Sequence, residues 1–126
     1  MPRPPVLIVD DARTTRTHMK LLLEGTYQVQ VAASGEEGLE LARQLGPQLS
    51  AVLLDVQMPG MGGIECLRAI KGDASLAGVP VVMVTTRGEE ETLAKCRDLG
   101  CDGYVTKPVQ SKELFDVLRN LLRARG

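Results

Sequence analysis

The feature that most constrains the fold is a regular alternation of short apolar runs with longer stretches of helical spacing. Runs rich in Val, Leu and Ile occur at residues 6–9, 29–33, 51–54, 79–84 and 103–105. Gly, Pro, Asp or Ser bounds each run, which is typical of buried strands. Between the runs, apolar residues recur three and four positions apart, as on one face of a helix. The pattern predicts a strand followed by a helix, repeated five times.

The helical stretches carry start and stop signals. Ser34, with a glutamate three residues later, matches a capping box, and Gly46 ends the helix that it opens. Gly100 stands where a glycine commonly follows a helix. Asp11 and Ser111 are placed to cap the first and the last helix.

Continuously apolar strands separated by helices predict an α/β fold, with a parallel sheet that is covered on both faces. Right-handed crossovers leave few topologies for such a chain. We expect residues 1–126 to form a single domain, because this length leaves little room for two. A doubly wound sheet binds ligands outside the carboxyl ends of its strands, so the residues at those ends are the candidate site.

Composition excludes several classes of partner. Lys and Arg number 15 against 16 Asp and Glu, which gives a formal net charge of -1. Such a balance lacks the electrostatic footprint of nucleic-acid binding, and the only aromatics, Tyr27, Tyr104 and Phe115, cannot build a base-stacking platform. We therefore expect no direct nucleic-acid partner and an aliphatic core.

Cysteine usage and the first residues indicate the compartment. Cys66, Cys96 and Cys101 are an odd number with no CxxC pair, which disfavours a disulfide framework or a structural zinc site. The first apolar run is short and ends in two aspartates, so it predicts neither a secretory signal nor a membrane span. We expect a cytoplasmic protein with no membrane partner.

Chemically active side chains follow four of the predicted strands. Asp10 and Asp11 follow the first strand, Asp55 the third, Thr85 the fourth and Lys107 the fifth. Carboxylates gathered at one sheet edge repel one another, and a divalent cation that prefers oxygen ligands, such as Mg²⁺, relieves that repulsion. Lys107 and Thr85 are suited to hold an anion, and a phosphoryl group fits both.

Asp55 is the candidate nucleophile among the three carboxylates. It stands alone after the central strand, where it is best placed to face the opening of the site. A carboxylate that attacks phosphorus forms an aspartyl phosphate, which is an established kind of covalent catalysis. A metal ion and Lys107 would offset the charge on the transferring group.

Four segments, in this order and spacing, make the chain similar to the receiver domain of response regulators in bacterial two-component signalling, especially the single-domain chemotaxis type. They are residues 6–11 (VLIVDD), 53–63 (LLDVQMPGMGG), 80–85 (PVVMVT) and 103–108 (GYVTKP). The resemblance covers nearly the whole chain. It implies a flavodoxin-like, five-stranded parallel sheet in the order 2-1-3-4-5 with five helices.

The resemblance also implies roles for the residues at the strand ends. Asp55 would accept a phosphoryl group from a sensor histidine kinase or a phosphotransfer protein. The cofactor Mg²⁺ would be held by Asp10, Asp11, Asp55 and the backbone carbonyl of Gln57. Lys107 would bind a phosphoryl oxygen, and the Lys107-Pro108 peptide bond would be cis, a form that X-Pro bonds adopt readily.

Signalling in this family implies a switch. Thr85 would move to the phosphoryl group, and Tyr104 would turn into the space that Thr85 leaves. This movement would change the surface of the fourth helix, fifth strand and fifth helix, where a downstream protein target binds. Gln57 and Arg87, which stand two residues after Asp55 and Thr85, would set the lifetime of the phosphoryl group. Such a domain is a monomer or a phosphorylation-dependent dimer.

Two other functions compete with this one. A docking module of the same fold that needs no phosphorylation is disfavoured, because every acidic, hydroxyl and lysine position is intact. A phosphatase of the haloacid dehalogenase type would have Asp-x-Asp after the first strand and a cap insertion, and the chain has neither. We therefore expect a regulatory domain rather than an enzyme, limited to self-phosphorylation from small donors and autodephosphorylation. His18 is expected to be a surface residue, and Phe115 serves either the core or a partner face.

Overall fold

A computed structural model of the chain describes residues 3–86 and 88–125, and these form five strands and five α-helices in strict alternation. The elements in chain order are β1 (Pro5–Val9), α1 (Arg13–Leu23), β2 (Gln28–Ala32), α2 (Gly35–Leu45), β3 (Ala51–Asp55), α3 (Gly63–Gly72), β4 (Val81–Thr85), α4 (Glu90–Asp98), β5 (Gly103–Thr106) and α5 (Ser111–Arg125). A 3₁₀ turn, Gly46–Gln48, joins α2 to β3. The predicted repeat of strand and helix is confirmed.

The five strands form one parallel sheet in the order β2-β1-β3-β4-β5. Val6 of β1 pairs with Val29 on one side and with Ala51 on the other. The predicted α/β fold and strand order are therefore confirmed. Because all the strands are parallel, their carboxyl ends meet at one edge of the sheet, and this edge carries the candidate site.

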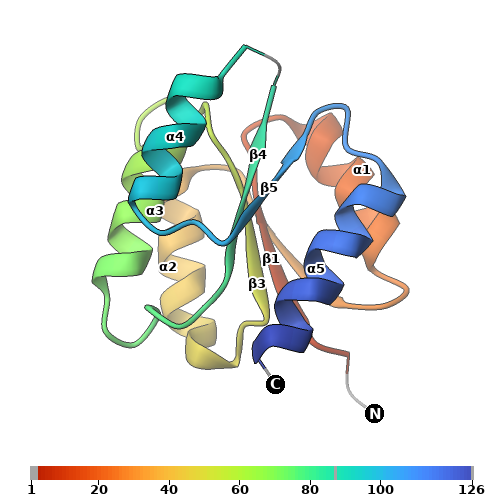
Figure 1. The fold of residues 1–126 in the computed structure, drawn as a ribbon. Coiled ribbons are helices and arrows are strands. Elements are labelled where there is room, and N and C mark those ends of the chain that lie inside the picture. Colours follow the sequence, from red (N-terminus) through yellow and green to blue (C-terminus); the bar gives the residue numbers. More distant parts are fainter. Residues whose placement is uncertain (1–2, 87, 126) are drawn as a thin grey trace.

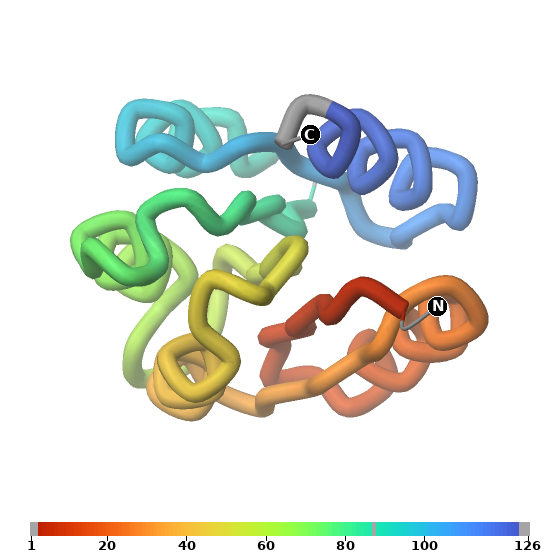
Figure 2. The backbone as a smooth tube through the Cα atoms, turned by 90° about the horizontal axis from the view of Figure 1, so that it is seen from below, coloured from red at the N-terminus to blue at the C-terminus, as the bar shows by residue number. Residues whose placement is uncertain are grey.

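Helices cover both faces of the sheet, with α2, α3 and α4 on one face and α1 and α5 on the other (Figures 1 and 2). Alternating side chains of each strand supply the two cores. Leu7 and Val9 of β1 pack with α2, α3 and α4, whereas Val6 and Ile8 pack with α1 and α5. Both cores are mainly aliphatic, as predicted.

The predicted helix signals are mostly confirmed. Ser34 caps α2, since its Oγ accepts a hydrogen bond from the Glu37 N–H at 3.1 Å. Gly100 follows α4 with a positive φ of 98°. The expectation for Asp11 is wrong, because Ala12 stands at the N-cap of α1 and that helix start has no capping hydrogen bond from a side chain. Helix α5 begins at Ser111 itself, and the Gln110 carbonyl accepts its first helical hydrogen bond.

All five strands differ by one or two residues from their predicted bounds, and β2 and β4 differ at both ends. The runs at 29–33 and 79–84 correspond to β2 at Gln28–Ala32 and β4 at Val81–Thr85. Phe115 packs partly buried against the core, where its ring stacks with Tyr27 at a centroid distance of 6.2 Å. His18 is exposed, as expected, and its Nε2 lies 3.0 Å from the Val109 carbonyl oxygen.

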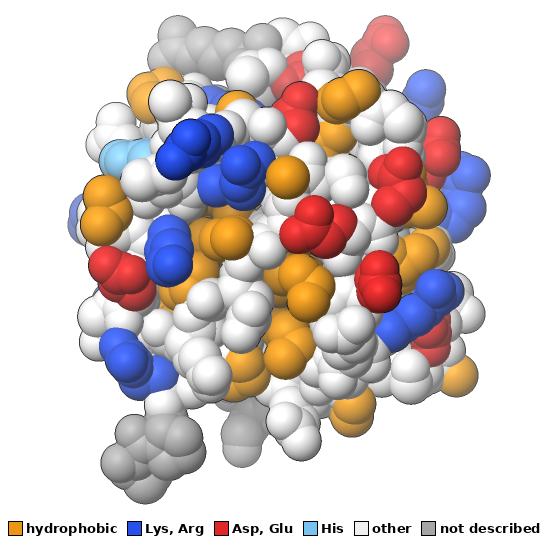
Figure 3. Space-filling model, turned by 180° about the vertical axis from the view of Figure 1, so that it is seen from behind, with side chains coloured by type: hydrophobic (Ala, Val, Ile, Leu, Met, Phe, Trp, Pro, Cys, Tyr) orange, Lys and Arg blue, Asp and Glu red, His pale blue; other side chains and the backbone are white. Residues whose placement is uncertain are grey.

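The surface is mixed in character. On the side shown in Figure 3, basic and acidic side chains are interspersed with hydrophobic ones, in keeping with the near-neutral composition. Among the helices of residues 3–86 and 88–125, none combines the length and apolar character needed to cross a membrane.

Candidate phosphoacceptor and metal site

The sheet brings the predicted site residues to one edge. Asp55 and Thr85 are the last residues of β3 and β4, and Asp10 and Lys107 follow β1 and β5 directly. The register aligns these ends, because Asp55 pairs with Val84 and Thr85 pairs with Thr106. Side chains that are far apart in sequence therefore become neighbours.

Three carboxylates form a compact cluster at this edge. One oxygen from each of Asp10, Asp11 and Asp55 lies within 4.8 Å of the other two. Asp10 is fully buried and Asp55 is 5% exposed, whereas Asp11 is exposed to solvent. Two charges are thus held away from water, and the third lies at the surface.

The ammonium group of Lys107 contacts this cluster and supplies a positive charge. Its Nζ lies 3.2 Å from Asp10 Oδ2 and donates a hydrogen bond to Asp55 Oδ1 at 3.3 Å. Burial works against the charge of the ammonium group, but the Asp55 and Asp10 carboxylates outweigh it and raise the pKa of Lys107 above its ordinary value. Lys107 is therefore firmly positive.

One lysine does not neutralise the cluster. Burial, and then the neighbouring Asp10 carboxylate, raise the pKa of Asp55 to about 6, although Lys107 and the Gln57 backbone N–H act in the opposite direction. The carboxylate of Asp55 is thus costly to ionise in the folded chain. A further positive charge at this edge would remove that cost.

Asp10 has one oxygen available for such a charge. Its Oδ1 accepts a hydrogen bond from the Ala12 N–H at 2.8 Å, and Arg16 donates to its carbonyl oxygen at 2.8 Å, so the side chain is held in place. Its Oδ2 is buried and accepts no hydrogen bond from the described residues, and its contact there is the ion pair with Lys107 at 3.2 Å. A buried carboxylate oxygen with no hydrogen bond, beside two more carboxylates that share one lysine, fits a hard divalent cation such as Mg²⁺.

The loop from β3 to α3 fixes the backbone of Asp55. The Val56 N–H donates to Val84 O at 3.1 Å, and the Gly63 N–H donates to Val56 O at 3.0 Å. A Cβ on Gly63 would lie only 2.2 Å from the Asp55 carbonyl oxygen, so only glycine permits this approach. Gln57 follows in the loop, with its side chain exposed.

The end of β5 is fixed in a similar way. The Lys107 N–H donates to Thr85 O at 2.7 Å, and Thr106 N–H donates to the Glu113 carboxylate at 3.2 Å. The Lys107-Pro108 peptide bond is cis, as the family resemblance implies. The chain thereby turns away from the sheet directly after the lysine that contacts the carboxylates.

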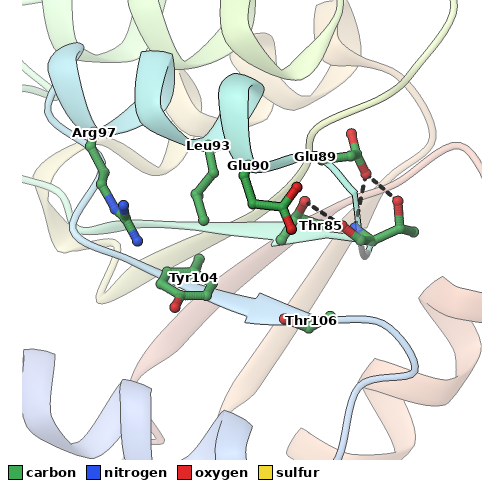
Figure 4. Close-up of a pocket in the computed structure, with 8 residues that line it drawn as sticks. Thr85, Glu89, Glu90, Leu93, Arg97, Tyr104 and Thr106 are labelled. Atoms are coloured by element: carbon green, nitrogen blue, oxygen red, sulfur yellow. Dashed lines mark hydrogen bonds between the residues drawn. The ribbon is translucent and has the colours of Figure 1, made fainter.

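Thr85 and Tyr104 lie along one pocket between α4 and β5 (Figure 4). Thr85 is buried, and its hydroxyl donates to the Thr86 carbonyl at 3.2 Å. Tyr104 is 42% exposed, and the Arg97 guanidinium lies 5.3 Å from the centre of its ring. The pocket has a volume of about 270 Å³, which leaves space beside the ring.

Two further residues bear on the site: Arg87, which was predicted, and Glu89, which was not. Arg87 lies outside the described residues. Glu89, which is not among the predicted site residues, accepts hydrogen bonds from both the backbone N–H and the hydroxyl of Thr86. The signal that could have revealed it is its position, four residues after Thr85 and directly before α4.

The sequence and the structure were compared with known proteins. The profile of the response regulator receiver domain matches residues 6–119. The chain is 36% identical to the protein PilH of Pseudomonas aeruginosa over 93% of this chain and 96% of PilH, and 35% identical to the chemotaxis protein CheY of Halobacterium salinarum over 94% and 97%.

Longer relatives and solved structures complete this comparison. Other relatives are transcriptional regulators, and the chain spans only about half of their length, 51% or 52%. The crystal structure of the chemotaxis protein CheY4 of Vibrio cholerae superposes with a TM-score of 0.87 at 29% identity, covering 95% of this chain and 99% of that one.

Proposed function

The chain belongs to the response regulator receiver domain family, and from this premise we propose that it is a switch whose phosphoacceptor is Asp55. The observation that carries the proposal is the cluster itself. A buried, reluctantly ionised carboxylate lies beside two others, and one lysine contacts both buried members. No simpler structural role requires two buried carboxylates and a lysine at the ligand-binding edge of a parallel sheet.

The proposed reaction is transfer of a phosphoryl group from a phosphohistidine. An oxygen of the Asp55 carboxylate attacks phosphorus while the phosphorus–nitrogen bond breaks. The imidazole leaves with the electron pair of that bond and takes up a proton, and an acyl phosphate remains on Asp55. Lys107, which already contacts Asp55, would then donate to a phosphoryl oxygen.

Mg²⁺ is the proposed cofactor, and its candidate ligands are Asp10, Asp11, Asp55 and the Gln57 carbonyl. When bound, it would supply positive charge that offsets the charge of the carboxylates and of the phosphoryl oxygens. The Ala12 and Arg16 contacts hold Asp10, whose Oδ2 accepts no hydrogen bond from the described residues and lies beside the Lys107 ammonium. The exposed Asp11 and Gln57 complete a half-open site with room for water and for the phosphodonor.

The output of the switch is proposed to pass through Thr85 and Tyr104. Movement of the Thr85 hydroxyl toward the phosphoryl group would give up its bond to the Thr86 carbonyl and leave space in the pocket. The exposed Tyr104 ring would occupy that space and give up its contact with Arg97. The surface of α4, β5 and α5 would change accordingly for a downstream protein in the cytoplasm, with a sensor histidine kinase or a phosphotransfer protein as the phosphodonor.

Phosphorylation by a small donor tests this proposal. Incubation with phosphoramidate or acetyl phosphate and Mg²⁺ should raise the intact mass by one phosphoryl group in the wild type and in Asp116→Asn, an exposed aspartate of α5. The mass of Asp55→Asn should stay unchanged. An unmodified wild type would favour a docking module that needs no phosphorylation. Turnover of a phosphomonoester that survives Asp55→Asn would favour a phosphatase.

A further inference from the structure

The side chain of Glu89 lies at the end of the pocket where β4 ends at Thr85 (Figure 4). Glu89 directly precedes α4, yet its carboxylate accepts no hydrogen bond from the first turn of that helix, as side chains at this position commonly do. It turns back toward β4 instead. Its Oε1 accepts the Thr86 N–H at 2.8 Å and also the Thr86 hydroxyl.

The same carboxylate reaches both sides of the site. Burial opposes its charge, but hydrogen bonds from Thr86 and interactions with the side chains of Gln57 and Thr85 outweigh burial and hold the pKa of Glu89 below its usual value. Gln57 follows the phosphoacceptor strand β3, and Thr85 ends the neighbouring strand β4. Through its hydrogen bonds to Thr86, Glu89 places a negative charge directly beside the end of β4, the strand that neighbours β3 and Asp55.

The backbone N–H and the hydroxyl of Thr86 are the two hydrogen-bond donors that Glu89 occupies. An N–H and an O–H at the ligand-binding edge of the sheet are suitable donors to any anion held there. Glu89 already occupies both of them, and its second oxygen, Oε2, is buried with no hydrogen-bond partner in the described part of the chain. The carboxylate is thus held mainly by donors that a phosphoryl group on Asp55 would also use.

We propose that Glu89 is an internal competitor of the phosphoryl group: its carboxylate occupies the Thr86 donors in the unphosphorylated protein and must leave them before a phosphoryl group on Asp55 can bind there. Two anions cannot share one pair of donors, and like charges so close together repel. Glu89 is a positioning residue in this scheme, since it acts through Thr86. The inference rests on the proposed function, because it needs an anion on Asp55.

Removing the charge of Glu89 should favour the phosphorylated form. Beryllium fluoride, added with Mg²⁺, can stand in for the phosphoryl group on Asp55, and its apparent dissociation constant can be measured by NMR titration. Glu89→Gln keeps the size of the side chain but not its charge. We expect this variant to bind beryllium fluoride about tenfold more tightly than the wild type, the effect of one charge-assisted contact. The Thr86 amide resonance should shift on binding in both proteins.

The matched control is Glu91→Gln, which removes the same charge from an exposed residue in the first turn of α4. It should bind like the wild type. An unchanged or weaker affinity in Glu89→Gln would overturn the competition, as would an equal gain in Glu91→Gln, which would indicate a general effect of charge. If neither the wild type nor the control binds beryllium fluoride, the proposed function fails and the competition fails with it. A wild type that binds while Glu89→Gln gains nothing refutes the competition alone.

Discussion

The Asp55 carboxylate is buried in surroundings that disfavour its negative charge. It is 5% exposed, it lies beside the fully buried Asp10, and Lys107 is shared between the two. The chain thus keeps a carboxylate at the cost of stability, because that carboxylate is the proposed nucleophile. A pKa of about 6 for Asp55, against an ordinary value of 3.8, expresses this cost.

The first prediction concerns the stability of the metal-free protein. A pKa that is higher in the folded state means that folding favours protonated Asp55. The contribution of Asp55 to the free energy of unfolding is therefore fully present below about pH 4 and is lost as the pH rises through 6. In EDTA at pH 7.5, Asp55→Asn should raise the free energy of unfolding by about 1–3 kcal/mol, and at pH 4 by much less. Urea denaturation at the two pH values measures the difference. The control Asp116→Asn should show no such dependence, and a destabilised Asp55→Asn at pH 7.5 would contradict the prediction.

The residues at the strand ends could be predicted from the sequence, because the topology of a parallel sheet fixes where those ends lie. Asp10, Asp55 and Lys107 follow apolar runs, and parallel strands bring such positions to one edge. Glu89 could not be predicted in this way. Its role depends on a side chain that turns back from a helix start to Thr86, and periodicity carries no information on that choice.

Helix α3 starts in direct contact with the backbone of Asp55, the proposed phosphoacceptor. A Cβ at Gly63 would lie 2.2 Å from the Asp55 carbonyl oxygen and 2.7 Å from the Val56 Cα. Both contacts involve backbone atoms, which cannot move aside as a flexible side chain can. The first turn of α3 is therefore part of the support of the site.

Two glycines of α3 should respond differently to alanine. Gly63→Ala should lower the free energy of unfolding by about 1–3 kcal/mol, the usual cost of overpacking, and should slow phosphorylation, because the Asp55 backbone must shift. Gly72→Ala, at the other end of the helix, meets nothing within 4 Å and should be neutral or stabilising by up to about 1 kcal/mol. Urea denaturation and the phosphorylation assay check both variants. Equal free energies of unfolding for Gly63→Ala and Gly72→Ala would show that the loop from β3 to α3 accommodates the added methyl group without loss of stability.

The existence of the elements was easier to predict than their ends. Val79 and Pro80 are buried and apolar, but Val79 N–H bonds to Leu76 O in a turn and proline has no N–H, so β4 begins at Val81. Strand β2 begins at the exposed Gln28, whose place in the ladder depends on pairing with Pro5 rather than on hydrophobicity. Hydrogen bonding, more than apolar character, decides these boundaries.

At the scale of the whole molecule, the carboxylate cluster exists only when the sheet is assembled. Asp10 and Asp11 come from the end of β1, and Asp55 comes from β3, after α1, β2 and α2 have intervened. Two separate cores, one on each face, hold β1 and β3 in register. A ligand of this cluster therefore binds the folded chain and not the unfolded one.

Metal binding should accordingly stabilise the entire fold. A ligand specific for the native state raises the free energy of unfolding by about 1.4 kcal/mol when its free concentration is about ten times its dissociation constant. Added Mg²⁺ should therefore shift the urea midpoint of the wild type upward, beyond the shift given by NaCl at equal ionic strength. Asp10→Asn removes the charge of the fully buried carboxylate of the cluster and should lose most of this gain. Asp98→Asn, an exposed aspartate of α4, should keep it. A gain that survives in Asp10→Asn would place the ion elsewhere, because a site built from two strand ends cannot lose its buried ligand and keep its affinity.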